Sequence, residues 1–140
     1  MTPRTILILE DDAGRIAGFE AAVATLGPGF RLWLWRDAPT MLAECRPALA
    51  RACLISLDHD LAPKPGGPAN PGTGLEVAEF LGRQPPVCPV LIHTSNSERR
   101  WTMHKAFRAG HWRVGVVLPA GDQWIPLSWR PRARALIAPA

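Results

Sequence analysis

The sequence of 140 residues contains no tyrosine and no long apolar run. A membrane-spanning helix needs about 20 consecutive apolar residues, and every apolar stretch here is far shorter. The apolar stretch near the amino end, residues 5–9, is also too short for the core of a secretory signal peptide. We therefore expect a protein that does not enter the membrane and that resides in the cytoplasm.

Cysteine is scarce, and the cysteines that occur do not form a recognisable ligand set. Cys45, Cys53 and Cys88 are odd in number, lack metal-ligand spacing and lie among apolar residues. This pattern favours buried free thiols over disulfides or zinc ligands, as in reducing surroundings. Internal repeats are absent too, and the length is typical of one domain. We predict a single domain over residues 1–140, with its core at about 5–119.

The sequence is rich in tryptophan, with six residues, and its charge is unevenly distributed along the chain. Acidic residues gather in the first 80 positions, whereas the last 60 hold most of the arginines, and the net charge is +4. Tryptophan rings stack on nucleobases in RNA-binding proteins. Large rings serve mainly for burial, however, so we expect most of the six to pack inside the protein.

Short, unbroken apolar runs predict strands that are buried on both faces. Four such runs occur at residues 6–9, 53–57, 90–92 and 114–118, and a more polar one at 31–35. Helical spacing of apolar residues at 16–26 and 41–49 predicts two helices, a capping-box sequence at Thr73 begins a third, and a fourth extends over about 98–109. Gly27 and Gly110 are placed to end the first and last of these helices.

This alternation of strands and helices predicts an α/β fold: a doubly wound, five-stranded parallel sheet of the flavodoxin-like type, order 2-1-3-4-5, with helices on both faces. Ligands of such folds bind at the carboxyl ends of the strands. Residues 120–140 have weak helical character, so we expect an irregular basic tail there. Residues 62–72 hold four prolines and three glycines and predict a loop, either a lid over the strand ends or a surface loop without a chemical role.

Polar residues follow three of the predicted strands at the same edge of the sheet. They are Glu10, Asp11 and Asp12 after the first strand, Asp58, His59 and Asp60 after the third, and His93, Thr94, Ser95 and Asn96 after the fourth. Clustered carboxylates repel one another unless a cation lies between them, so the four aspartates predict a site for a divalent metal ion. Magnesium is the first choice because it prefers carboxylate and water oxygens, while ligation by a histidine would allow manganese or zinc.

Simpler structural roles compete with these assignments. Asp12 is placed to cap the helix that follows it, and Asp60 to cap its own loop. A single histidine more often makes a structural hydrogen bond than acts in catalysis. His59 and His93 differ from the other two histidines because they follow strands and stand beside acids.

At these positions the chain resembles the receiver domains of two-component response regulators, over residues 5–119. Asp11 and Asp12 match the acid pair of that family, Asp58 its phosphate-accepting aspartate and Thr94 its hydroxyl residue. The family's lysine after the fifth strand is missing, since Leu118 stands in its place. Ordinary phosphorelay signalling would therefore lack the cation that usually stabilises the phosphoryl group on the aspartate.

The sequences 58–60 (Asp-His-Asp) and 93–96 (His-Thr-Ser-Asn) further resemble the subgroup of cyclic-phosphate-processing receiver domains, which is linked by inference to RNA repair. The resemblance implies opening of 2′,3′-cyclic phosphates at RNA ends in a metal-binding pocket. Asp58, His59 and His93 would then be catalytic. Thr94, Ser95 and Asn96 would bind the phosphate.

Two other functions remain open at this point. One is an atypical receiver that accepts a phosphoryl group on Asp58 and signals to a protein partner, whose identity the sequence does not indicate. The other is a binding module for an RNA end. Basic residues that would contact its phosphates occur near the strand ends at 99–101 (Arg-Arg-Trp) and in the tail at 130–134.

Overall fold

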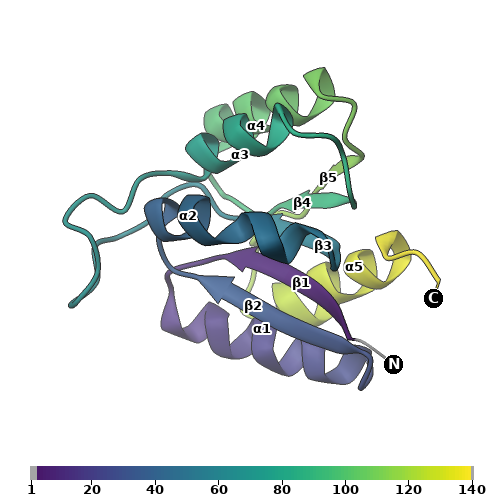
Figure 1. Ribbon diagram of the computed structural model, residues 1–140. Coiled ribbons are helices and arrows are strands. Elements are labelled where there is room, and N and C mark those ends of the chain that lie inside the picture. Colours follow the sequence, from purple (N-terminus) through teal and green to yellow (C-terminus); the bar gives the residue numbers. More distant parts are fainter. Residues whose placement is uncertain (1–2, 140) are drawn as a thin grey trace.

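The computed structural model describes residues 3–139 and contains a five-stranded parallel sheet between two layers of helices (Figure 1). The strands are β1 (Arg4–Leu9), β2 (Phe30–Trp35), β3 (Ala52–Leu57), β4 (Val90–Ile92) and β5 (Val114–Val116). The α-helices are α1 (Ala13–Leu26), α2 (Ala38–Leu49), α3 (Gly74–Gly82), α4 (Ser97–Ala109) and α5 (Arg130–Leu136). The strand order is β2-β1-β3-β4-β5, which confirms the predicted topology.

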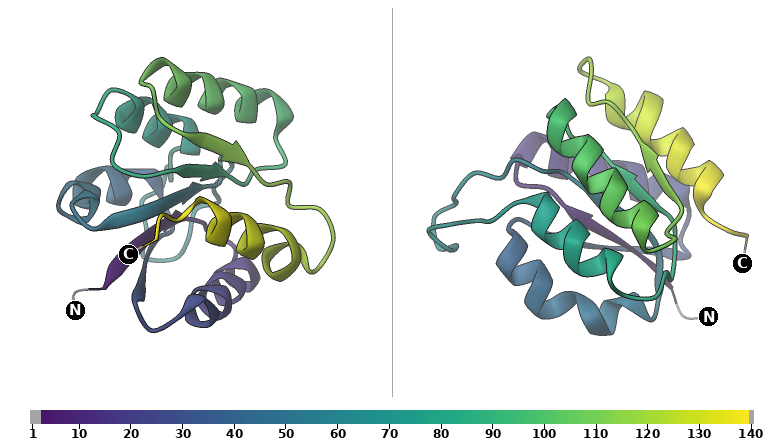
Figure 2. Two further views of the ribbon diagram at one scale, coloured as in Figure 1. Left: turned by 90° about the vertical axis from the view of Figure 1, so that its right-hand side faces the viewer. Right: turned by 90° about the horizontal axis from the view of Figure 1, so that it is seen from above.

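Each face of the sheet contributes to a separate hydrophobic core because side chains alternate along a strand. From β1, Leu7 and Leu9 pack with α2, α3 and α4 on one face, whereas Ile6 and Ile8 pack with α1 and α5 on the other. All four are fully buried, and each such side chain contributes about 1.5–3 kcal/mol of hydrophobic stabilisation. The two helical layers are visible in Figures 1 and 2.

Side-chain caps explain where three of the helices begin. Asp12 Oδ2 accepts a hydrogen bond from the Arg15 backbone N–H (2.9 Å) at α1. Asn96 Oδ1 accepts one from the Arg99 backbone N–H (3.1 Å) at α4. Thr73 forms the predicted capping box at α3. Two residues that the sequence assigned to the site, Asp12 and Asn96, therefore also have structural roles.

The expectation of an irregular tail was wrong. A π-helical segment, η1 (Ile125–Trp129), continues directly into α5. Ile125, Trp129, Ala133 and Leu136 form its buried stripe against the sheet. Pro126 lies in the first turn of η1, where a missing N–H leaves no intrahelical hydrogen bond unmade, and Pro131 lies at the junction where η1 passes into α5. Neither proline ends the helical segment.

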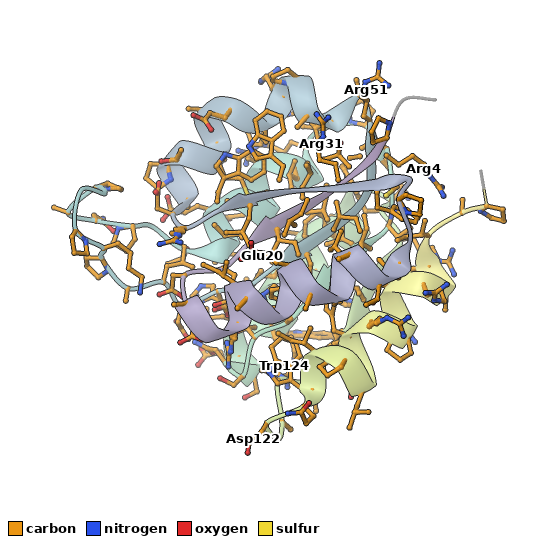
Figure 3. All side chains as sticks on the ribbon, turned by 90° about the horizontal axis from the view of Figure 1, so that it is seen from below. Arg4, Glu20, Arg31, Arg51, Asp122 and Trp124 are labelled. Atoms are coloured by element: carbon orange, nitrogen blue, oxygen red, sulfur yellow. The ribbon has the colours of Figure 1, made fainter. Side chains whose placement is uncertain are left out.

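The tail is also fastened to α1 by polar and aromatic contacts. Arg130 Nε donates to Thr25 Oγ1 (2.6 Å), and an Arg134 Nη donates to the Thr25 carbonyl (3.4 Å). Trp124, which lies beside α1 in Figure 3, packs edge-to-face on Phe19 with ring centroids 5.8 Å apart. These two arginines thus hold the tail against α1, and the same side chains are then less available to contact RNA.

Tryptophan is used mainly for packing, as expected. The indoles of Trp35, Trp112, Trp124 and Trp129 are buried, and only Trp33 and Trp101 are substantially exposed. The cysteines are free thiols, two buried and one partly buried. Within residues 3–139, none of the helices combines the length and the apolar character that crossing a membrane requires.

Candidate functional site

Three carboxylates meet where β1 and β3 end. Each of Glu10, Asp11 and Asp58 offers an oxygen, and these oxygens all lie within 4.8 Å of one another. The sheet register brings them together, because Leu9 pairs with Leu57 and the Asp58 N–H donates to the Leu9 carbonyl (3.1 Å). Glu10 is fully buried, and Asp58 is 5% exposed. The cluster is a candidate divalent cation site.

The acid pair beside Asp58 is Glu10 and Asp11, not Asp11 and Asp12 as predicted. Glu10 continues the pairing of β1, since its N–H donates to the Trp35 carbonyl (3.0 Å). Asp12 instead caps α1 and lies at the exposed rim of the pocket. A signal for Glu10 was present in the sequence: it is the first acid after the apolar run of β1 and lies on the face of Ile6 and Ile8.

An open pocket of about 370 Å³ lies over this cluster. Its lining consists of Asp11, Asp12, Arg15, Asp58, Asp60, Ala62, Lys64, Thr94 and Ser95. The pocket thus brings together the four predicted aspartates and two of the three residues that were predicted to bind phosphate. The third, Asn96, lies at the edge and donates its amide N–H to Asp60 Oδ2 (3.3 Å).

Two basic residues in the pocket were not identified from the sequence. An Arg15 Nη lies 3.8 Å from Glu10 Oε1 and 3.8 Å from Asp58 Oδ2. Lys64 comes from the loop at 62–72 and makes no ion pair with any residue that the structure describes. Helical spacing after Asp12 offered a signal for Arg15, whereas the path of an irregular loop gave none for Lys64.

The loop at 62–72 touches the pocket only with its amino-terminal part. The Ala62 N–H donates to Asp11 Oδ2 (2.6 Å), which fixes this part beside the acids. At the other end, the Pro71 carbonyl accepts from the Ala38 N–H (2.8 Å). The tip between them projects away from the helices (Figure 1). A lid function for the tip therefore stays a prediction, while the position of Lys64 beside the pocket is defined.

His93 lies beneath the pocket and does not line it. Its side chain is 0% exposed, with Nε2 3.1 Å from Glu10 Oε1 and Nδ1 2.7 Å from Ser56 Oγ. Ser56 Oγ in turn accepts a hydrogen bond from Trp129 Nε1 (3.0 Å). Every donor is matched if the Ser56 hydroxyl donates to His93 Nδ1 and His93 Nε2–H donates to Glu10. This buried chain connects the tail to the acidic cluster.

His59 is likewise shielded from the pocket. It is 5% exposed, and its Nδ1 lies 2.9 Å from Oδ1 of Asp60. Asp60 itself lines the pocket and has an exposed carboxylate. The two histidines that the sequence suggested as catalytic therefore both stand behind a carboxylate, and each is placed to orient that carboxylate.

Burial shapes the protonation of the cluster. Burial and the nearby charge of Glu10 raise the pKa of Asp58 to about 6. Burial also pushes the pKa of Glu10 upward, but the hydrogen bond with His93 and the backbone N–H of Asp12 hold that pKa below its ordinary value. A divalent cation would relieve the cost of ionising Asp58. The donor atoms are all oxygens, which fits magnesium better than zinc.

The raised pKa of Asp58 gives the metal-free protein a defined pH dependence. The folded state keeps a proton on Asp58 that the unfolded chain, with an ordinary pKa of 3.8, has already lost. Stability from this group is therefore complete below about pH 4 and is lost as the pH rises through 6. The loss is roughly 3 kcal/mol.

Urea unfolding in chelator between pH 4 and 7.5 measures this loss, with Asp58→Asn as the matched variant. We expect the stability difference between Asp58→Asn and wild type to grow in favour of the variant as the pH rises. A difference that stays constant over this range would contradict the raised pKa.

Known proteins resemble this chain in fold and in sequence. The sequence profile of the family described as "Cyclic-phosphate processing Receiver domain" matches residues 6–109. No match was found among curated proteins. A solved response regulator receiver domain from Rhodospirillum rubrum has a TM-score of 0.68 and 17% identity, covering 94% of this chain and 92% of that chain.

Two further solved structures agree in fold. The phosphorylated cyanobacterial phytochrome response regulator RcpA has a TM-score of 0.68 and 19% identity, covering 96% of this chain and 91% of that chain. A CheY-like response regulator receiver domain from Methanospirillum hungatei has a TM-score of 0.65 and 14% identity, covering 96% and 95%. Identities this low establish the shared fold alone.

Proposed function

The chain belongs to the family of cyclic-phosphate processing receiver domains, and we propose that its acidic pocket opens 2′,3′-cyclic phosphates at RNA ends with the help of a divalent ion, magnesium first. One observation carries this proposal. A carboxylate cluster suited to a cation shares an open pocket with two basic residues and two hydroxyl residues suited to a phosphate. A site that processes a phosphoester with a metal ion needs both sets of groups.

The carboxylates would hold the ion. Asp11 and Asp58 line the pocket, while Glu10 lies behind them with its oxygens bonded to His93 and to the N–H groups of Asp11 and Asp12. When bound, the divalent ion neutralises charge on phosphoryl oxygens and makes water a better nucleophile. Manganese, which accepts the same oxygen donors, is the expected substitute.

Other groups that line the pocket would bind the phosphate. Thr94 Oγ1 accepts a hydrogen bond from the Asn96 N–H (3.2 Å), so its hydroxyl hydrogen is free to donate to a phosphoryl oxygen. Ser95 adds a second hydroxyl, and the Lys64 ammonium and Arg15 guanidinium add positive charge. Charged donors of this kind form the stronger hydrogen bonds to phosphate.

Ring opening forms one bond to phosphorus and breaks one. In one route a water oxygen attacks and loses its proton, the bond from phosphorus to one ribose oxygen breaks, and that oxygen takes up a proton. In the other route the Asp58 carboxylate attacks, the same bond breaks, and a water then cleaves the acyl phosphate and replaces the proton that the ribose oxygen has taken up. Asp60, oriented by His59, is the pocket carboxylate placed to accept or return the proton. His93 acts on Glu10 from below and does not touch the substrate.

A short RNA with a 2′,3′-cyclic phosphate end tests the proposal. The end group is followed by mass in magnesium, manganese or chelator, for wild type, Asp58→Ala and the control Asp122→Ala, which changes an acid outside this pocket. We expect metal-dependent ring opening that falls by about a hundredfold or more in Asp58→Ala and stays unchanged in the control. Absence of turnover with every metal, or full turnover in Asp58→Ala, would reject the proposal.

An atypical receiver is the second candidate. The observation that favours it is Lys64, which forms no ion pair within residues 3–139 and shares the pocket with Asp58 and Thr94, although Leu118 follows β5. Asp58 would then accept a phosphoryl group from a small donor. Incubation with acetyl phosphate and magnesium, followed by intact mass, distinguishes this function: a stable phosphoryl adduct without ring opening of RNA would favour signalling.

A further inference from the structure

We propose that the exposed face of α4 binds the single-stranded RNA that leads to the pocket, with Trp101 as a stacking platform for a base. The link to a cyclic end rests on the proposed function, whereas the binding of the strand does not. The surface consists of Trp101, His104, Lys105 and Arg108, here called the α4 stripe.

The position of α4 connects the pocket to the outer surface of the molecule. Thr94 and Ser95 line the pocket, and α4 begins two residues later at Ser97. An α-helix rises about 1.5 Å per residue, so Trp101 lies about 6 Å and Arg108 about 16 Å beyond Ser97 along the axis. α4 lies on the outside of the sheet beside α3 (Figure 2). A strand that ends in the pocket would therefore have α4 as an adjacent track.

The spacing of the α4 stripe places its members on one face of the helix. They occur at intervals of three and four residues, while Met103 and Phe107 are buried on the opposite face. Trp101 is 64% exposed, although four of the six tryptophans are buried. Its ring lies parallel to that of His104, with an interplanar angle of 7° and centroids 6.1 Å apart. Exposed flat rings of this kind are the groups on which unpaired bases stack.

The charge of the α4 stripe fits a phosphate backbone. Lys105 and Arg108 are exposed, and among the described residues neither forms an ion pair. Arg100 is used differently, because its Nη1 donates to the Thr94 carbonyl (3.0 Å) and ties α4 to the pocket loop. Arg130 and Arg134 of the tail bond to Thr25. The α4 stripe therefore offers, beside the pocket, positive charge that no described acid neutralises.

Single-stranded RNA fits this surface better than a duplex or a protein helix. Stacking requires bases that are not already stacked in a helix. A protein helix would need an apolar groove, and the α4 stripe offers one large apolar ring between polar groups.

Fluorescence anisotropy with a labelled single-stranded RNA of about ten nucleotides tests the inference in the full chain. Trp101→Ala should weaken the affinity about tenfold, since one stacked base is lost. The matched control, Trp33→Ala, removes another exposed indole on β2 and should leave the affinity unchanged. Lys105→Glu combined with Arg108→Glu should reduce the slope of log affinity against log salt by about 1–2.

A mononucleoside 2′,3′-cyclic phosphate separates this inference from the proposed function, because it lacks the preceding nucleotides that the α4 stripe would bind. The Trp101→Ala protein should open this small cyclic phosphate at the wild-type rate while its affinity for RNA is reduced. Equal RNA affinities of wild type and Trp101→Ala, or RNA binding that does not depend on salt, would overturn the role of α4. Salt-dependent RNA binding that requires Trp101, without turnover of either substrate, would support α4 and reject the proposed chemistry.

Discussion

Replacing Gly74 by alanine is expected to destabilise the protein by about 3 kcal/mol or more and to disrupt the acidic pocket. A β-carbon on Gly74 would lie 1.8 Å from the Asp58 carbonyl oxygen and 2.9 Å from the His59 Cα. Both are backbone atoms, so neither can rotate away. The start of α3 would have to separate from the segment after β3, which the Gly74 N–H holds through the His59 carbonyl (3.0 Å).

Urea unfolding measures the loss of stability, and magnesium titration monitors the pocket. Gly29→Ala is the matched control, because a β-carbon there meets no atom within 4 Å. We expect that control to change stability by less than about 0.5 kcal/mol. A Gly74→Ala protein with wild-type stability and wild-type magnesium affinity would show that α3 does not position Asp58 in the way described.

Replacing His93 by alanine should cost about 3–4 kcal/mol. The substitution opens a cavity next to Phe19 and Trp124, whose ring centroids lie 5.0 and 5.8 Å from the centroid of the imidazole. It also leaves the fully buried Glu10 without its hydrogen bond to the imidazole. The pKa of Glu10 should rise as a result, because the hydrogen bond with His93 is one of the interactions that hold it low.

A double-mutant cycle with Glu10→Gln separates the free-energy cost of losing the Glu10–His93 pair from the cost of the cavity. Once Glu10 carries no charge, the His93→Ala change should cost clearly less, which gives a coupling free energy of about 1–3 kcal/mol. His104→Ala, at a partly exposed histidine on α4, serves as the control and should show no coupling with Glu10→Gln. Strict additivity of Glu10→Gln and His93→Ala would contradict the buried pair.

The fold could be predicted from the sequence because its strands are buried on both faces. Runs such as 53–57 and 90–92 contain apolar residues at nearly every position, a pattern that central parallel strands require. The tail was missed for a physical reason. The segment that contains Pro126 and Pro131 was judged to have weak helical character, but Pro126 lies in the first turn and the apolar spacing from Ile125 to Leu136 is helical.

The site could be predicted only where strand ends determined it. Asp11, Asp58 and Asp60 meet because β1 and β3 are neighbours in register. The identity of the acid pair depended on a shift of one residue at the end of β1, and such a shift moves a side chain to the other face. The same alternation places His93 on the buried face with Leu91. Its position after the strand suggested that His93 lines the pocket, whereas in the fold the side chain is buried beneath it.

The proposed chemistry depends most on the cation that Asp11 and Asp58 would hold. Crystals grown with manganese, a magnesium substitute that can be located by its anomalous scattering, test this claim directly. We predict one strong peak in the pocket in contact with carboxylate oxygens of Asp11 and Asp58, and loss of that peak in Asp58→Asn. An empty pocket at saturating manganese, or an ion bound elsewhere in the molecule, would contradict the account.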